Sequence, residues 1–208
     1  MKMKFAVQSR RISEFIFAAV FSVAIAGLPE RAVTQELKQQ APKTQLEAFT
    51  GENGVVVIKG YTNVGDVSGT GKVNVTAMTF KNANTGKETS GIVVEVKTAT
   101  AYSNASRSFV DYDEISGLLA GMEYVYKTDK SVTKLKNFEA TYSTKGDLKV
   151  TVFDDSAGKK NVAIQVGTIG SGQAFLGLDK LAQFAQLIIK AKDILDYPDT
   201  AAKSQTTR

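Results

Sequence analysis

One amphipathic helical segment, flanked by two long runs of strand-like sequence, constrains this fold more than any other feature of the chain. At 100° per residue, apolar side chains spaced three and four residues apart share one face of a helix. We therefore predict a helix over about residues 112–127, with its apolar stripe on a β-sheet. The stripe consists of Ile115, Leu118, Leu119, Met122, Val125 and Tyr126.

The start of this helix carries acidic residues that suit the unpaired N–H groups of a first turn. Either Asp111 or Asp113 is expected to cap it, and Glu114 stands at capping-box spacing from Asp111. Gly117 and Gly121 lie one turn apart, and each lowers helix propensity by about 1 kcal/mol relative to alanine. Two explanations remain open: another backbone passes close to the glycines, or the helix is intrinsically weak.

A second helix is predicted over about residues 179–196. It has a broad apolar face, Asp179 at the expected N-cap and Pro198 just beyond its end. The width of that face predicts that the helix covers a sheet. The members of the face are Leu181, Phe184, Leu187, Ile188, Ala191, Ile194 and Leu195.

The remaining sequence between residues 47 and 177 is typical of β-strands. Apolar and polar residues alternate around residues 72–80 and 92–98, and again over 138–143, 148–152 and 162–166. Short turns separate these segments, and no βαβ pattern is present. We predict an α+β fold: a single curved antiparallel β-sheet or small barrel-like β domain, with the two helices between and after the strand groups. The domain should span residues 47–197.

Residues 1–26 have the three parts of a secretory signal peptide: a basic start, an apolar segment and the small-residue pattern of Ala24 and Ala26. The apolar segment is shorter than the roughly 20 residues of a membrane-spanning helix. We predict cleavage after Ala26, export to the periplasm or the extracellular space, and no stable transmembrane anchor after cleavage. Residues 27–46 are expected to form a polar leader, and residues 198–208 a disordered tail.

Charge gives little support to nucleic-acid binding. The first 26 residues hold four of the 26 basic residues and one of the 21 acidic residues, so their removal lowers the formal net charge from +5 to +2. No basic run with interspersed aromatic residues remains after that. The expected partner is an unknown protein, glycan or lipid ligand rather than a nucleic acid.

The absence of cysteine and histidine excludes disulfides, thiolate or imidazole metal sites, and catalysis by Ser-His or Cys-His pairs. Two short segments resemble a phosphate-binding loop and a calcium-binding loop but lack essential features of each. Residues 65–72 (GDVSGTGK) have the wrong glycine spacing for a phosphate loop, and a strand follows where that loop needs a helix. Residues 154–158 lack the ligand series of a calcium loop and are expected to form a hairpin turn. We predict no cofactor and no metal.

Any enzymatic activity would have to use carboxylates. Asp111, Asp113 and Glu114 lie close together in the sequence, and two carboxylates in one cleft can act as acid and base in sugar hydrolysis. Helix capping accounts for the same residues without chemistry. A carboxylate-based hydrolase is therefore the weakest of the functional hypotheses, and we predict that the chain is not an enzyme.

Aromatic residues gather around the central helix in the sequence. Tyrosine combines apolar area with a polar tip and is enriched at interfaces. We take five residues as candidate interaction residues: Tyr102, Phe109, Tyr112, Tyr124 and Tyr126. The preferred hypothesis is an exported, non-catalytic binding or interaction protein of unknown ligand. The alternative is a carrier of a small apolar ligand such as a lipid, held between the sheet and the C-terminal helix.

Overall fold

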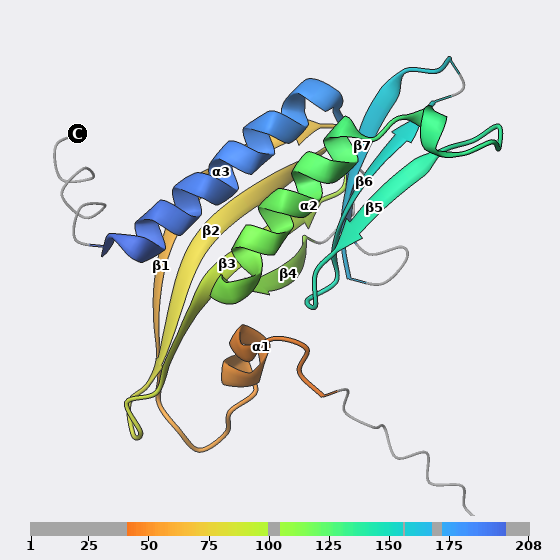
Figure 1. The fold of residues 1–208 in the computed structure, drawn as a ribbon. Helices are drawn as coiled ribbons and strands as arrows, with labels where there is room; N and C mark the ends of the chain where they lie inside the picture. The colour runs from red at the N-terminus through yellow and green to blue at the C-terminus, as the bar shows by residue number, and fades with distance from the viewer. Residues whose placement is uncertain (1–40, 100–104, 156, 168–171, 199–208) are drawn as a thin grey trace, which may run out of the picture. The chain divides into compact units, whose positions relative to one another are not determined.

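The computed structural model describes residues 41–99, 105–155, 157–167 and 172–198 (Figure 1). The predicted signal peptide, most of the leader, Tyr102 and almost all of the tail lie outside these residues. Among the described helices, none combines the length and the apolar composition that crossing a membrane requires.

The first four strands form an antiparallel sheet in chain order, here called sheet 1. Alternation places Val73, Val75 and Ala77 opposite Val96, Val94 and Ile92 on one face, and all six are buried. That face forms part of the main core. The strands are β1 (Val57–Gly69), β2 (Gly71–Asn82), β3 (Glu88–Lys97) and β4 (Ser106–Asp111).

The last four strands form a second antiparallel meander, sheet 2. Its inner face again consists of alternate residues, and Leu148 of one strand lies opposite Val166 of the next. The predicted periodicity of two is confirmed in these strands. They are β5 (Glu139–Ser143), β6 (Leu148–Asp154), β7 (Lys160–Val166) and β8 (Gly172–Gly177).

The α+β class and the antiparallel arrangement are confirmed, but the strands divide into two sheets, and neither closes into a barrel within the described residues. The chain leaves β4 into a helix instead of into β5, so β4 pairs only with β3 and β5 only with β6. Backbone hydrogen bonds join the two sheets at the β1–β2 turn. There the β1–β2 turn residue Thr70 pairs with Phe175 of β8, through two backbone hydrogen bonds of 2.8 Å.

Both predicted long helices are present. A short 3-10 turn, η1 (Tyr112–Glu114), leads into α2 (Ile115–Lys127), and α3 (Leu178–Asp196) follows β8. Helix α3 packs mainly on β1, β2 and β3, whereas α2 packs on β5 and β6 (Figure 1). Helix α2 follows sheet 1 in the chain but covers sheet 2, and α3 follows sheet 2 but covers sheet 1. One continuous apolar core joins both sheets and both helices.

The N-terminal side of the domain contains a helix that the sequence analysis did not predict. Residues 47–50 belong to α1 (Gln45–Thr50) instead of a strand. The Thr44 side chain accepts the Glu47 N–H at 3.0 Å, and Leu46 and Phe49 are buried. These two side chains form a second, smaller core with Phe80, on the face of sheet 1 opposite the main core.

The predicted helix caps are wrong. Asp111 makes no side-chain hydrogen bond to η1 or α2; its carboxylate accepts the N–H groups of Gln45 and Leu46, at 2.8 and 3.1 Å. Asp179 lies in the first turn of α3, whose N-cap is Gly177. The reason for the first error is tertiary, since Asp111 is buried beside the start of α1 and serves the helix that lies against β4.

The two glycines of α2 are explained by the ring of Tyr142 on β5. A Cβ atom on Gly121 would lie 2.1 Å from this ring, and one on Gly117 would lie 3.2 Å from its hydroxyl oxygen. A side chain, not another backbone, therefore makes the close approach. The glycines allow α2 to lie directly on sheet 2.

We expect Gly121→Ala to destabilise the protein by about 1 kcal/mol, because the overlap with Tyr142 outweighs the gain in helix propensity. Gly117→Ala is the matched control: its neighbour is the far end of a side chain, so it should be neutral or stabilising. Chemical denaturation of both variants measures the difference. Equal free energies of unfolding would show that Tyr142 does not fix this contact.

Candidate functional site

An apolar groove of about 420 Å³ lies between α2 and α3. We call it the α2–α3 groove. Two turns of α2 and two turns of α3 form its walls. The lining residues are Leu119, Ala120, Met122, Glu123 and Tyr126 of α2 and Leu181, Ala182, Ala185 and Ile189 of α3.

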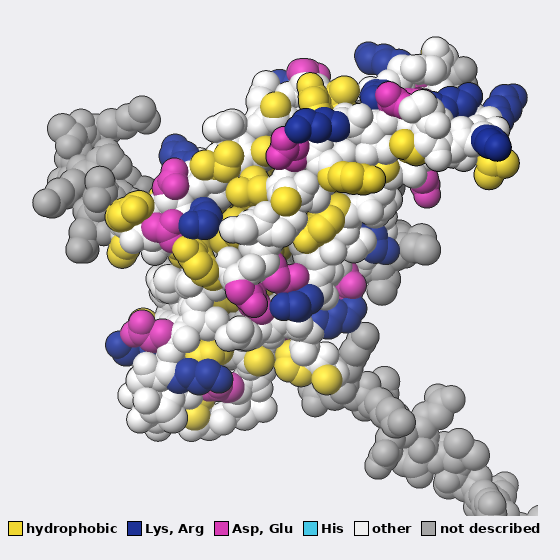
Figure 2. Space-filling model, viewed as in Figure 1, with side chains coloured by type: hydrophobic (Ala, Val, Ile, Leu, Met, Phe, Trp, Pro, Cys, Tyr) yellow, Lys and Arg dark blue, Asp and Glu magenta, His cyan; other side chains and the backbone are white. Residues whose placement is uncertain are grey.

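Small side chains create this groove. Ala120 on one helix and Ala182 and Ala185 on the other leave room where the two helices face solvent, while Met122 and Leu181 form a buried floor. The space is partly open to solvent and is not an enclosed cavity. Hydrophobic side chains are visible along this face of the molecule in Figure 2.

The rim of the groove is partly polar. Tyr126 is about half exposed, and Ile189 is 37% exposed. Glu123 forms an ion pair with Lys127 one turn later on α2. The pKa of Glu123 is below its usual value because Lys127 donates a hydrogen bond to it and carries the opposite charge. The rim therefore carries a paired charge, and the apolar floor is the part that a ligand would contact.

The five predicted aromatic residues do not form one site. Tyr126 lines the groove, and Tyr124, one turn from Ala120, is 72% exposed on α2. Phe109 packs against the small core beneath α1, on the other side of sheet 1. Tyr102 lies outside the described residues. Of the four that lie in the described residues, only Tyr126 lines the groove.

Tyr112 takes part in a polar cluster that joins the start of α2 to the end of α3. Its hydroxyl donates to Asp196, while the Lys192 ammonium donates to Asp196 at 2.6 Å and to the Tyr112 hydroxyl at 3.1 Å. The pKa of Lys192 is raised because it donates to Asp196, and the pKa of Asp196 is lowered by the same contact. The cluster keeps both groups charged and holds the two helices together.

The carboxylates that suggested hydrolysis have structural partners. Glu114 accepts the backbone N–H of Lys145 at 3.0 Å, and Asp113 lies 3.8 Å from the Lys145 ammonium. Asp113 is mostly exposed, and neither residue lines the α2–α3 groove. The Asp111 carboxylate accepts two backbone hydrogen bonds from α1, as described above. Their arrangement ties the β5–β6 turn to the start of α2.

The two rejected motifs form the turns expected of a β protein. Residues 65–72 include the end of β1 and the tight turn into β2, and they follow a β-bulge between Asn63 and Gly65. Asp155 accepts the N–H groups of Ala157 and Lys159, each at 2.9 Å, at the β6–β7 turn. The Lys159 hydrogen bond is the main reason that the pKa of Asp155 is lowered. Within the described ranges, no cluster of three or more acidic residues is arranged to hold a metal.

The spacing of apolar residues predicts the two helices but not the groove between them. The alanines that create the space carry no functional signal by themselves, and their meaning depends on α2 and α3 lying side by side. Comparisons with protein-family models, with curated proteins and with solved structures give no match to this chain.

Proposed function

We propose that this chain is an exported, non-catalytic binding protein, and that the α2–α3 groove receives the apolar face of a short helix from a partner protein. The observation that supports this proposal is an open groove with an apolar floor between two neighbouring helices. Its volume of about 420 Å³ falls within the range of ordinary ligand sites. The groove spans residues 119–126 of α2, a length of roughly 10 Å at 1.5 Å per residue.

A helical partner suits this shape better than a small solute. Two turns of an amphipathic helix present apolar side chains at spacings of three and four, which can enter an open trough side by side. Tyr126 and the alkyl part of the rim would flank those side chains, and the Glu123–Lys127 pair would lie at the edge of the contact. Tyrosine is enriched at such interfaces because it adds area with little entropy loss.

The apolar-ligand carrier is the second proposal. It needs a space between sheet and helices, where this protein has one continuous cluster of packed side chains. An acyl chain would therefore have to lie in the same surface groove. The two proposals differ in what the groove retains, which makes them separable by experiment.

Placing a charge in the groove tests the proposal. We expect Ala185→Arg to lower partner capture at least tenfold, because an unpaired charge on an apolar floor must be desolvated on binding. Gln186→Arg is the matched control, since Gln186 is exposed on the same helix and does not line the groove. Capture is measured in the native envelope with a photo-reactive amino acid at position 182, and thermal unfolding checks that both variants are folded.

Support requires that the cross-linked peptide of the captured protein carries an apolar helical stripe, and that the synthetic peptide binds the purified chain. Equal capture by Ala185→Arg and Gln186→Arg would contradict the proposal. Native mass spectrometry that finds a lipid retained by the Gln186→Arg variant but lost from Ala185→Arg, without a cross-linked protein, would establish the carrier function instead.

A further inference from the structure

The loop between α2 and β5 presents two exposed aliphatic side chains surrounded by lysines. We call residues 127–137 the basic loop. Val132 is 65% exposed and Leu135 is 73% exposed, although both are of the kind that usually enters a core. Lys127, Lys130, Lys134 and Lys136 lie in the same eleven residues, with Asp129 as the one acidic residue. The loop therefore carries a net charge of +3 around an apolar tip.

The exposure of Val132 and Leu135 follows from the loop's own hydrogen bonds. Asp129 accepts the Ser131 N–H at 2.8 Å and caps the short 3-10 helix η2 (Lys130–Val132). The Leu135 N–H donates to the Thr133 hydroxyl at 3.2 Å. The loop is thus held in a defined shape that turns both aliphatic side chains toward solvent.

Both ends of the loop are attached to the body of the domain. At one end, the ammonium of Lys160 on β7 donates a hydrogen bond to the Thr128 carbonyl at 2.9 Å. At the other end, Phe138, just after the loop, is buried. In Figure 1 the loop projects beyond the end of sheet 2, and Figure 2 shows Lys or Arg side chains gathered at that end with hydrophobic side chains among them. The tip is therefore accessible to an extended flat partner at this end of the molecule.

The lysines at the tip are available to an outside partner. Lys127 pairs with Glu123, but Lys130, Lys134 and Lys136 form no ion pair within the described residues. The pKa of Asp129 is lowered, chiefly by its hydrogen bonds from Ser131, so Asp129 stays charged and the loop keeps its net charge of +3. The exposed lysines therefore define a positive surface that an anionic partner would complement.

We propose that the basic loop docks on a bilayer rich in anionic phospholipid, with Val132 and Leu135 entering the headgroup region. Peripheral binding of this kind combines burial of apolar side chains with attraction of basic residues to lipid phosphates. Contacts with nucleic-acid phosphates or with a run of acidic residues would use the lysines alone, whereas a lipid surface also buries the aliphatic tip. The coincidence of both features at one protruding loop is what favours a lipid surface, and the inference does not depend on the α2–α3 groove.

The absence of cysteine allows a direct test in the full chain. An environment-sensitive dye is attached at Ser131→Cys in the basic loop and, as a reference, at Asn84→Cys in the β2–β3 turn. The dye reports its own surroundings, so a shift at position 131 without one at position 84 assigns the contact to the basic loop. The vesicles contain either phosphatidylglycerol and phosphatidylcholine in equal amounts or phosphatidylcholine alone.

With anionic vesicles we expect a blue shift of the dye at position 131, none at position 84, and reversal by high salt. Lys134→Gln/Lys136→Gln should weaken binding about 30-fold, since each lysine near an anionic surface contributes about fivefold. Lys97→Gln/Lys190→Gln removes two exposed lysines elsewhere and should change binding less than about twofold. Val132→Ser/Leu135→Ser should weaken binding at least about tenfold through lost apolar burial.

Three outcomes would overturn the proposal. One is no blue shift at position 131 with anionic vesicles. Another is an equal shift with phosphatidylcholine alone. The third is an equal response to soluble polyglutamate that Val132→Ser/Leu135→Ser leaves unchanged, which would assign the basic loop to an acidic protein.

Discussion

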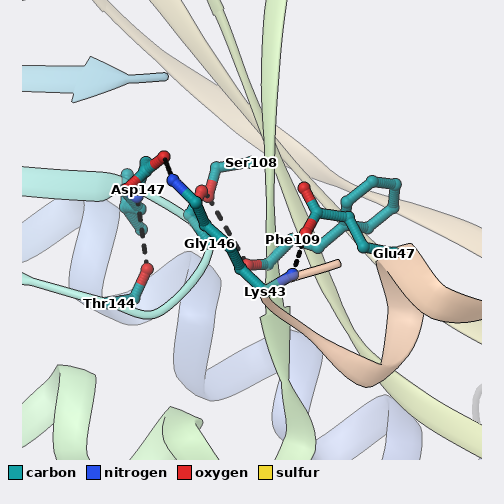
Figure 3. A network of polar contacts seen from close by, with 8 residues as sticks. Lys43, Glu47, Ser108, Phe109, Thr144, Gly146 and Asp147 are labelled. Carbon is teal, nitrogen blue, oxygen red and sulfur yellow. Dashed lines mark hydrogen bonds and ion pairs between the residues drawn. The ribbon is translucent and has the colours of Figure 1, made fainter. Parts of the chain in front are cut away.

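Gly146→Ala is expected to lower the free energy of unfolding by about 3 kcal/mol, at the upper end of ordinary overpacking. Gly146 lies in the β5–β6 turn, which contacts β4 of the other sheet (Figure 3). A Cβ atom there would lie 2.0 Å from the carbonyl oxygen of Phe109. This neighbour is backbone inside a strand, so it cannot move aside as a side chain can.

The same substitution disturbs a buried hydrogen bond. The Ser108 hydroxyl donates to the Gly146 carbonyl oxygen at 2.6 Å, and pushing the turn away from β4 would leave that carbonyl without its partner and the hydroxyl with only its 3.5 Å contact to the Phe109 carbonyl. Urea denaturation measures the loss. Lys145→Ala, the exposed neighbour in the turn, is the control and should change stability by less than about 0.5 kcal/mol. If Gly146→Ala behaved like this control, the turn would not be a fixed contact between the two sheets.

Asp111→Ala is expected to lower the free energy of unfolding by about 3 kcal/mol. The substitution leaves two N–H groups at the start of α1 without an acceptor in a buried part of the protein. The Asp111 carboxylate is 3% exposed and accepts both N–H groups, from Gln45 and Leu46. Loss of this cap also loosens Leu46 and Phe49 from the small core. The effect should therefore appear first at α1.

Two measurements separate this local effect from global unfolding. Hydrogen exchange should show lost protection over residues 45–50 in Asp111→Ala while sheet 2 keeps its protection. Asp113→Ala removes an exposed carboxylate two residues away and should leave both stability and exchange close to those of the native protein. Unchanged protection of α1 in Asp111→Ala would contradict the capping role.

The spacing of apolar residues along the sequence predicted most of the helices and strands. The alternation of Val73, Val75 and Ala77 and the stripe of Ile115, Leu118 and Met122 predicted elements that the structure contains. The division into two sheets depends on how β4 and β5 pair, and residue alternation does not encode pairing partners. Periodicity therefore predicts the elements better than it predicts their arrangement.

Two features were missed for different reasons. Thr44 and Glu47 have the spacing of a helix start, so α1 could have been predicted from the sequence. The partner of Asp111 could not, because about 65 residues separate it from the N–H groups that it accepts. The groove depends likewise on the packing of α2 against α3. The basic loop was present in the sequence as two aliphatic residues among lysines, a pattern without helical or strand periodicity.

Sheet 1 forms early in the chain but is covered by α3, the last helix, and this separation affects the order of folding. About 110 residues separate the end of β1 at Gly69 from the start of α3 at Leu178, the helix that covers sheet 1. During synthesis, the first four strands and α2 would emerge with the apolar face of sheet 1 still uncovered. Contacts between such distant segments slow folding and make it cooperative. The two halves should therefore become stable together, and neither should be protected from proteolysis or aggregation before α3 is in place.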